Sequence, residues 1–365
     1  MQINSQYHIG YPAKIIIEDG IFLKLPRVIR RDKELTRASK YLFVIDKNFQ
    51  LRHQRLLTSV FRNLKLDYAV AVVDAGIVIK SLAGAKMLYQ LFCRHNLKRD
   101  SVAVAIGGGT LCDAVGFAAA TYMRGIRMIN IPTTMMSCAD PVMGKVAINH
   151  FSQKNLIGTW FFPHLTLIDP ILIKKDVPRY FNTGIAEIIK SALVDGKDSF
   201  NNLKRDMNEL VAGNDEMIKK YIEMSVRVKT KFVKGDERDI NGQHVKLSLG
   251  HALADVIESA ASAKTVTHGE AVALGMIFAA CVNNILERTK RSKELFTRII
   301  QLIRLANLPT KIPFSLTAEQ VIEGLLKSKK SHNNTVTLVL IKDYGKVKIM
   351  TAIKSATIKK AYKAL

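Results

Sequence analysis

The sequence has few cysteines, little aromatic content and no long hydrophobic run. Aromatic residues make up 7% of the 365 residues, and there is one tryptophan. The cysteines are far apart, without paired metal-ligand spacing, so they predict reduced core thiols rather than a disulfide framework. They are Cys93, Cys112, Cys138 and Cys281.

Hydrophobic segments long enough to cross a bilayer are also missing. The longest uncharged apolar run, 271–282, is shorter than the ~20 residues that a membrane helix needs. The N-terminus lacks the basic and apolar regions of a signal peptide. We therefore expect a cytoplasmic protein with no membrane partner.

Positive charge is in excess. Lys and Arg number 55 against 31 for Asp and Glu, and the formal net charge is +24. These cations are spread along the chain, which predicts solvated faces that also attract phosphorylated metabolites. Zinc-finger spacing, an RNP-like aromatic pattern and a basic heptad region are all absent from the sequence, so we expect no nucleic-acid partner.

The order of the predicted elements indicates two domains. Short β-branched runs alternate with helical patterns in the first half, which predicts a parallel sheet covered on both faces. Helical periodicity dominates after about residue 170, including one predicted helix over 197–235. The fold class is therefore α/β followed by α: a Rossmann-like domain over 1–175 and a mainly helical domain over 176–365. The predicted strands are 41–46, 69–74, 102–106, 128–132 and 165–168, with a late hairpin over 335–341 and 346–350.

A glycine triplet follows one predicted strand and opens a helix. Glycine lets the backbone approach a pyrophosphate, and a helix N-terminus offers free N–H groups. A plain tight turn is the alternative. Asp46 and the pair Thr133 and Thr134 stand at the ends of two other predicted strands, and this agreement favours a dinucleotide site.

Metal-ligand residue types occur in the helical half. Glu187 lies in an apolar helical segment, while His251 and His268 stand at predicted helix starts. One carboxylate with two imidazoles is typical of a catalytic zinc site. The alternatives are helix-end polar groups for the histidines and a simple buried ion pair between Glu187 and Lys190.

Cationic and polar groups also interrupt an apolar, glycine-rich stretch. Arg124, Lys145, Lys154 and Asn155 lie near glycines, which suits a phosphate-bearing ligand. A solvated surface is the alternative for each of them.

Taken together, these segments resemble the 3-dehydroquinate synthase family and the wider sugar phosphate cyclase superfamily. The resemblance covers most of the chain, from Asp46 to 327–330, and includes the Tyr-Met-Arg-Gly, Ala-Glu-Ile-Ile-Lys and His-Gly-Glu-Ala segments. It implies a carbon–oxygen lyase that uses NAD and a divalent metal, Zn2+ or Co2+. In the family's reaction, a ring hydroxyl carbon of a phosphorylated seven-carbon sugar is transiently oxidised. Phosphate leaves, and an aldol step closes a carbocycle.

The resemblance also implies residue roles at the matching positions. Those implied for NAD are Asp46, Lys80, Gly107, Gly108, Gly109, Asp113, Thr133, Thr134 and Lys154. Those implied for the metal are Glu187, His251 and His268. Those implied for the phosphorylated sugar are Asp140, Lys145, Asn155, Lys190, Lys229 and Lys329, with Arg124 reaching into the partner's site of a homodimer.

Three substrate positions depart from the family pattern. His244 replaces an Arg, Ser248 an Asn, and Asp255 a second His. Because buried polar groups decide which substrate is accepted, these changes favour a sugar phosphate without a carboxylate, such as sedoheptulose 7-phosphate. The activity of 3-dehydroquinate synthase itself stays open beside this reading. An NAD-dependent polyol dehydrogenase on the same fold and a catalytically degenerate binding protein are the further alternatives.

Overall fold

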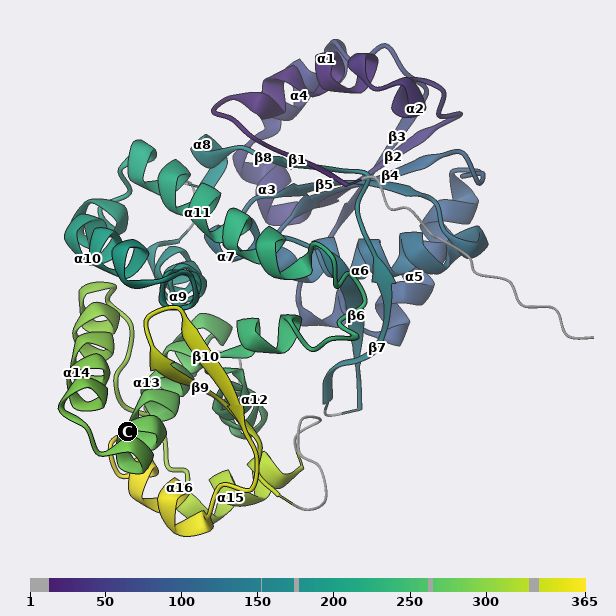
Figure 1. Cartoon of the computed structure of the whole chain (residues 1–365). Helices are drawn as coiled ribbons and strands as arrows, with labels where there is room; N and C mark the ends of the chain where they lie inside the picture. The colour runs from purple at the N-terminus through teal and green to yellow at the C-terminus, as the bar shows by residue number, and fades with distance from the viewer. Residues whose placement is uncertain (1–12, 152, 174–176, 262–264, 328–334) are drawn as a thin grey trace, which may run out of the picture. The chain divides into compact units, whose positions relative to one another are not determined.

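The computed structural model describes residues 13–151, 153–173, 177–261, 265–327 and 335–365. The chain forms two compact units (Figure 1). Unit 1 comprises residues 1–132 and 142–169, and unit 2 comprises 133–141 and 170–365. The short segment 133–141, which continues from the last residue of one strand, is therefore grouped with the helical part of the chain.

Unit 1 is built on a six-stranded parallel sheet in the order β1-β8-β5-β4-β2-β3. Its strands are β1 (Lys14–Ile17), β2 (Tyr41–Asp46), β3 (Tyr68–Val73), β4 (Val102–Gly107), β5 (Arg127–Pro132) and β8 (Leu165–Ile168). Its α-helices are α1 (Leu25–Arg31), α2 (Lys33–Thr36), α3 (Lys47–Arg52), α4 (Gln54–Arg62), α5 (Leu82–Arg94) and α6 (Gly109–Thr121). Three short 3-10 helices are η1 (Ile21–Lys24), η2 (Ile77–Ile79) and η3 (Tyr122–Arg124).

All five predicted strands of this sheet are present. Two features of unit 1 escaped prediction: the edge strand β1, which is only four residues long, and an antiparallel hairpin. The hairpin consists of β6 (Gly144–His150) and β7 (Gln153–Phe161). Most residues of β7 are exposed, so the run lacks the apolar pattern of a buried strand.

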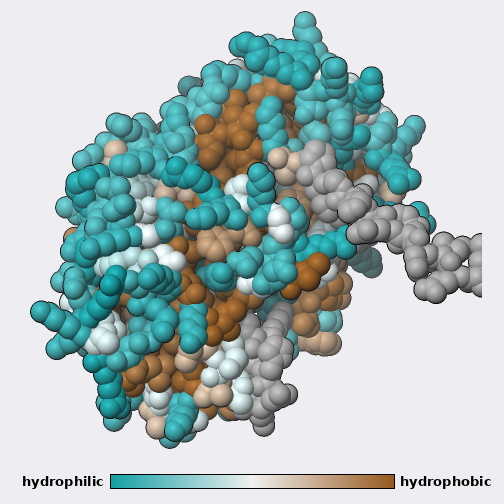
Figure 2. Space-filling view, in the orientation of Figure 1, coloured by the Kyte–Doolittle hydropathy of each residue, from teal (hydrophilic) through white to brown (hydrophobic). Residues whose placement is uncertain are grey.

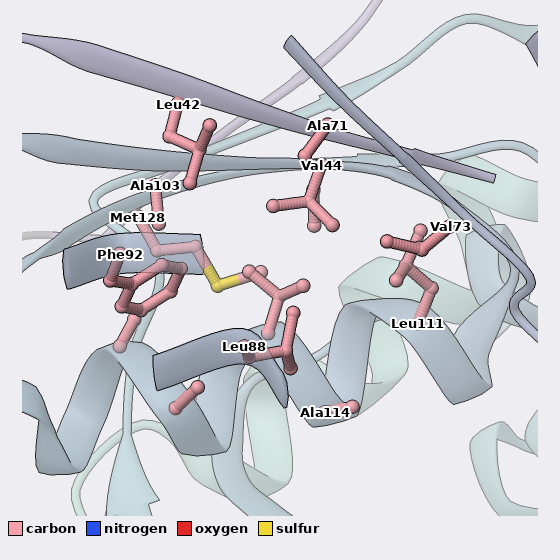
Figure 3. Packing of buried hydrophobic residues seen from close by; sticks show 14 of the residues in the cluster. Leu42, Val44, Ala71, Val73, Leu88, Phe92, Ala103, Leu111, Ala114 and Met128 are labelled. Carbon is pink, nitrogen blue, oxygen red and sulfur yellow. The ribbon is translucent and has the colours of Figure 1, made fainter. Parts of the chain in front are cut away.

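The core of unit 1 lies between the sheet and the helices α5 and α6. Figure 3 shows Leu42 and Val44 of β2 pointing towards Leu88 and Phe92 of α5. Because β2 and β4 are covered on both faces, their residues form nearly continuous apolar runs.

Hydrophobic side chains also gather at the surface over the edge strand β1 (Figure 2). A cavity of about 250 Å³ lies at this edge, and its lining includes Lys14, Ile16 and Arg27 but none of the predicted site residues.

Unit 2 is mainly helical, as predicted. Its helices are α7 (Met135–Ala139), α8 (Pro170–Ile173), α9 (Pro178–Asp195), α10 (Lys197–Val211), α11 (Asp215–Val233), η4 (His244–Ser248), α12 (His251–Ala260), α13 (His268–Glu287), α14 (Lys290–Leu305), α15 (Ala318–Leu326) and α16 (Ser355–Tyr362). The late hairpin is β9 (Leu338–Asp343) and β10 (Lys346–Met350). The confirmed fold class is thus a Rossmann-like parallel-sheet part followed by a mainly helical part.

Two predictions were wrong. The single helix over 197–235 is two helices, because Gly213 adopts a positive φ of 80° and Asn214 caps α11 by accepting from the Met217 N–H. Cys93 is exposed on α5, whereas Cys112, Cys138 and Cys281 are buried. An apolar neighbourhood in the sequence did not reveal which face of α5 carries Cys93.

Helix α13 forms the centre of unit 2. Among the described residues it is the one helix whose length and composition would allow it to cross a membrane. However, 78% of its most apolar window is buried inside the structure, as is typical of a core helix.

Candidate functional site

Three helices of unit 2 bring Glu187, His251 and His268 together. One donor atom from each residue lies within 4.8 Å of the others. The Glu187 Oε1 atom is 3.6 Å from the Nε2 atoms of both His251 and His268. Tetrahedral zinc with ligands at about 2.1 Å places its donors about 3.4 Å apart, so this spacing suits one divalent ion.

Glycines allow the three ligand-bearing helices to approach so closely. A Cβ atom at Gly269, next to His268, would overlap the backbone carbonyl of Thr183 in α9. A Cβ at Gly275, farther along α13, would overlap the carbonyl of Gly250. Gly250 itself has a φ of 85° and precedes the first residue of α12, His251, a conformation that favours glycine. These contacts set the distance between α13 and its two neighbours.

The environments of the three ligands differ. The Glu187 side chain is 1% exposed, that of His251 21% and that of His268 40%. No described residue gives either Glu187 oxygen a hydrogen bond of normal geometry, although buried carboxylates normally have such partners. A divalent ion would give the Oε1 atom, which faces both histidines, a partner. The partly exposed histidine side leaves room for a further ligand.

Buried charges surround Glu187. The ammonium of Lys190, one helical turn later, contacts the Glu187 Oε2 atom. Burial would raise the pKa of Glu187, but Lys190 and then His268 hold it well below its ordinary range. Burial would likewise lower the pKa of Lys190, but Glu187 and Asp140 raise it. The two carboxylates therefore favour the charged ammonium form of Lys190.

A second ion pair lies beside this group. Lys229 of α11 contacts Asp140 at 2.6 Å and donates to the Pro141 carbonyl at 2.6 Å. Burial would raise the pKa of Asp140, but Lys229 and then Lys190 lower it. The predicted residues Asp140, Lys190 and Lys229 are thus electrostatically coupled to Glu187.

The outer nitrogens of the two imidazoles are also engaged. The Nδ1 atom of His268 is 3.1 Å from a Glu258 oxygen, and that of His251 is 3.3 Å from the Leu249 carbonyl. Burial would lower the pKa of His268, but Glu187 and Glu258 raise it to about 10. At neutral pH a metal ion would therefore displace a proton from this imidazole.

The glycine triplet lies in unit 1 between β4 and α6. Gly107 ends β4, Gly108 caps α6 and Gly109 begins the helix, so the free N–H groups of its first turn follow the triplet. A Cβ at Gly107 would lie 3.1 Å from the Cβ of Asp46, which caps α3 through the Phe49 N–H. This donor set suits a pyrophosphate, with the Asp46 carboxylate beside it.

The other residues predicted to bind NAD are divided between the units. Lys80 and Asp113 form an ion pair in unit 1, and Asp113 also accepts from the Ala147 N–H at 3.0 Å. Thr134 of unit 2 caps α7, and Thr133 next to it is buried. Lys154 is exposed on β7.

The cationic groups of the glycine-rich stretch lie on the hairpin of unit 1 and on η3. Lys145 of β6 stacks over the Trp160 ring at 5.2 Å from its centroid. The Asn155 N–H donates to the Asn149 side chain at 3.0 Å. Arg124 is exposed and has a φ of 68°, a backbone conformation that is uncommon outside glycine.

The three positions that depart from the family pattern lie in η4 and α12. His244 is buried, and its N–H donates to Asp239 at 2.9 Å. Ser248 ends η4, one residue before Leu249, whose carbonyl contacts His251. Asp255 is exposed and follows His251 by four residues in α12, so the two share a helix face.

Not every predicted residue can be placed, and some contributors were missed. Lys329 lies outside the described residues. The metal-ligand set, Lys190, Asp140 and Lys229 come together in unit 2, whereas Arg124, Lys145, Asn155 and the glycine triplet belong to unit 1. Sequence reasoning missed Glu258 and the glycines that let the helices approach. The available signal for Glu258 was its spacing of seven residues from His251, which places both on one helix face.

Comparisons with known proteins show the family of the chain. Residues 70–182 match the 3-dehydroquinate synthase N-terminal family, and residues 184–331 match the 3-dehydroquinate synthase C-terminal family. The 3-dehydroquinate synthase of Desulforamulus reducens is 33% identical over 356 residues, 97% of this chain and 96% of the relative.

Solved structures share the fold. A 2-epi-5-epi-valiolone synthase from Streptomyces hygroscopicus, with NAD+ and Zn2+ bound, superposes with a TM-score of 0.85 at 22% identity, covering 99% of this chain and 98% of the other. A 2-deoxy-scyllo-inosose synthase, complexed with carbaglucose-6-phosphate, NAD+ and Co2+, gives 0.84 at 21% identity and covers 96% of each chain. The sequence matches over nearly the whole length place this chain in the 3-dehydroquinate synthase family of sugar phosphate cyclases.

Proposed function

We propose that this protein is an NAD- and divalent-metal-dependent lyase that cyclises a phosphorylated seven-carbon sugar. The reaction eliminates phosphate and closes a carbocycle by an intramolecular aldol step. One observation carries the proposal: donor atoms of Glu187, His251 and His268 lie within 4.8 Å of one another. Family membership supports the reaction class. The cytoplasmic location of the protein stays a prediction.

Glu187, His251 and His268 would hold the metal, Zn2+ or Co2+. When bound, such an ion supplies Lewis-acid stabilisation of negative charge on a substrate oxygen. The buried Glu187 fixes one side of the site, and the more exposed His268 leaves the other side accessible. Substrate would therefore approach from the histidine side.

Lys190 and Lys229 would bind and orient the anionic substrate. Glu187 and Asp140 raise the pKa of Lys190, which favours an ammonium that donates hydrogen bonds to substrate oxygens. A fixed cation at this place stabilises oxygens on which negative charge develops. Lys145, Asn155 and Lys329 complete the proposed substrate set.

The start of α6 would hold NAD, which supplies reversible hydride transfer when bound. The N–H groups after Gly107, Gly108 and Gly109 would bind the pyrophosphate, and Asp46 would accept from ribose hydroxyls. The paired side chains Lys80 and Asp113 lie in the same unit. Thr133, Thr134 and Lys154 complete the proposed set.

We propose a substrate range that includes sugar phosphates without a carboxylate. His244 is buried at the position where the family has an Arg, so a permanent cation for a substrate carboxylate is missing there. Asp255 adds a negative charge one turn after His251, and this charge disfavours a dianion beside it. Lys246, whose ammonium donates to Gln243 at 2.9 Å, is the nearest cation in the η4 sequence.

We also propose a homodimer in which Arg124 completes the partner's site. Arg124 and its neighbour Met123 both have positive φ, and such strain is often kept where a side chain must be presented. Mixing the inactive variants Arg124→Ala and Lys190→Met tests this. One complete site per mixed dimer would restore about a quarter of the parent activity, and no restoration would overturn the proposal.

Phosphate release tests the activity itself. The protein, loaded with NAD and Zn2+, is assayed with the heptulosonate 7-phosphate substrate of 3-dehydroquinate synthase and with sedoheptulose 7-phosphate. Release of phosphate from either sugar phosphate, without a net rise in NADH absorbance at 340 nm, supports a cyclase. The Glu187→Ala variant should release no phosphate. Accumulating NADH would identify a polyol dehydrogenase instead. If the protein instead binds nucleic acid or an acidic partner in a salt-sensitive way, and Glu187→Ala and His268→Ala leave that binding unchanged, it is a binding protein.

A further inference from the structure

We propose that Glu258 is a positioning residue of the metal site, which fixes the orientation and the proton of His268. This inference rests on the metal role of the Glu187, His251 and His268 set proposed above. It assigns to Glu258 a function that is exerted through the imidazole of His268.

The two nitrogens of His268 face different carboxylates. Its Nδ1 atom is 3.1 Å from the Glu258 Oε2 atom, while its Nε2 atom is 3.6 Å from the Glu187 Oε1 atom. An ionised carboxylate can only accept a hydrogen bond, so Glu258 keeps the hydrogen on Nδ1. The Nε2 lone pair is then directed at the place where a metal would lie beside Glu187.

Helix geometry explains how one short helix supplies both a ligand and a positioning group. His251 is the first residue of α12, and Glu258 follows seven residues later, which is two turns along the same face. Helices α12 and α13 lie side by side (Figure 1). The face of α12 that carries His251 therefore also carries Glu258 against the start of α13, where His268 stands.

Burial makes the role of Glu258 more specific. Its side chain is 5% exposed, and a buried carboxylate is costly unless it is paired. The Nδ1 atom of His251 instead contacts the neutral carbonyl of Leu249 at 3.3 Å. The two imidazoles are thus held by acceptors of different charge, and a negatively charged acceptor makes His268 the more basic ligand.

The test measures metal affinity in the full-length protein. Co2+ and Zn2+ are titrated in competition with a chromophoric chelator, for the parent, Glu258→Gln and Ser259→Ala. Ser259 is the matched control, because it is the next residue of α12, is exposed, and donates to the Asp255 carbonyl at 2.7 Å. Loss of the carboxylate should weaken affinity ~10- to 100-fold, whereas Ser259→Ala should stay within about twofold.

Two further measurements distinguish a positioning role of Glu258 from a purely structural one. The visible absorption of bound Co2+ should change in Glu258→Gln, and the rise in Tm on adding Zn2+ should shrink. The metal-free Tm reports any general loss of stability. Glu258→Asp, which keeps a carboxylate on a shorter side chain, should recover part of the affinity and serves as the second variant if Glu258→Gln does not fold.

The outcomes are distinguishable. Parent protein that binds neither Co2+ nor Zn2+ overturns the proposed function and this inference together. Parent protein that binds metal, with Glu258→Gln unchanged in affinity and Co2+ spectrum, overturns this inference alone.

Discussion

Arg179 of α9 and Glu270 of α13 form a bidentate ion pair. The Arg179 Nε atom donates to Glu270 Oε1 at 2.9 Å, and an Nη atom donates to Oε2 at 2.8 Å. The same carboxylate accepts from the Thr267 N–H at 2.8 Å and so closes the capping box of α13. The pair therefore joins the helix that carries Glu187 to the start of the helix that carries His268.

A double-mutant cycle of Arg179→Ala and Glu270→Ala should measure this link. Because two parallel hydrogen bonds to a carboxylate are stronger than a single exposed pair, we expect a coupling energy of ~1 kcal/mol in urea unfolding. The exposed pair Lys327 and Glu323 is the control, and its coupling should be about 0.3–0.5 kcal/mol. Equal couplings would contradict the special role of the bidentate pair.

Removing the Glu187 charge should destabilise the metal-free protein. Glu187→Gln leaves the buried Lys190 ammonium without the carboxylate that it contacts, and breaking a buried ion pair costs ~3 kcal/mol or more. The double variant Glu187→Met with Lys190→Met removes both charges and should recover part of that loss. Urea unfolding at pH 7 with a chelator present measures both, and a double variant less stable than Glu187→Gln would refute the explanation.

Gly269→Ala should separate α13 from α9. The added methyl group would overlap the Thr183 carbonyl, and relief of such overpacking costs ~1–3 kcal/mol. We expect lower stability together with at least tenfold weaker Zn2+ binding, because His268 moves with the start of α13. Gly116→Ala is the matched control: its methyl group meets a Val146 side chain in unit 1, so Zn2+ affinity should not change.

Lys229→Met should separate substrate activation from metal binding. Lys229 pairs with Asp140 rather than with a metal ligand, so Zn2+ affinity should stay within about threefold of the parent. Phosphate release should fall ~100-fold, the usual cost of removing one group that stabilises developing charge. An unchanged rate would remove Lys229 from the proposed substrate set.

Asp206 should make the stability of unit 2 depend on acid pH. Burial raises the pKa of Asp206, but hydrogen bonds from Arg205, Lys220 and Tyr221 outweigh it and hold the pKa well below its ordinary value. A lowered folded-state pKa stabilises the protein above the unfolded pKa of about 3.9, and this contribution is lost as the pH falls further.

The variant Asp206→Asn tests that dependence. It should lower the free energy of unfolding by ~1–2 kcal/mol at pH 7, because hydrogen bonds to a charged group are lost. The difference from the parent should shrink between pH 4 and pH 2, as measured by urea unfolding. A difference that is constant with pH would assign the effect to packing instead of charge.

Local sequence signals were sufficient for five strands of the sheet but not for the short edge strand β1. The strands β2 and β4 are continuous apolar runs, and the glycine triplet after β4 lies at the start of α6. The strand β7 was missed because its mostly exposed residues follow no apolar alternation. The break at Gly213 was missed because the helical periodicity continues on both sides of it.

For the candidate site, the sequence by itself determined the residue types: a carboxylate, two imidazoles and nearby lysines in an apolar helical context. It could not determine that Glu187, His251 and His268 converge, because 64 and 17 residues separate them. Only the tertiary structure decided this, since Gly269 and Gly275 let α13 touch the backbone beside both partner ligands. Local patterns specify which face of a helix is buried, whereas the distance between two helices depends on side-chain volumes that meet only after folding.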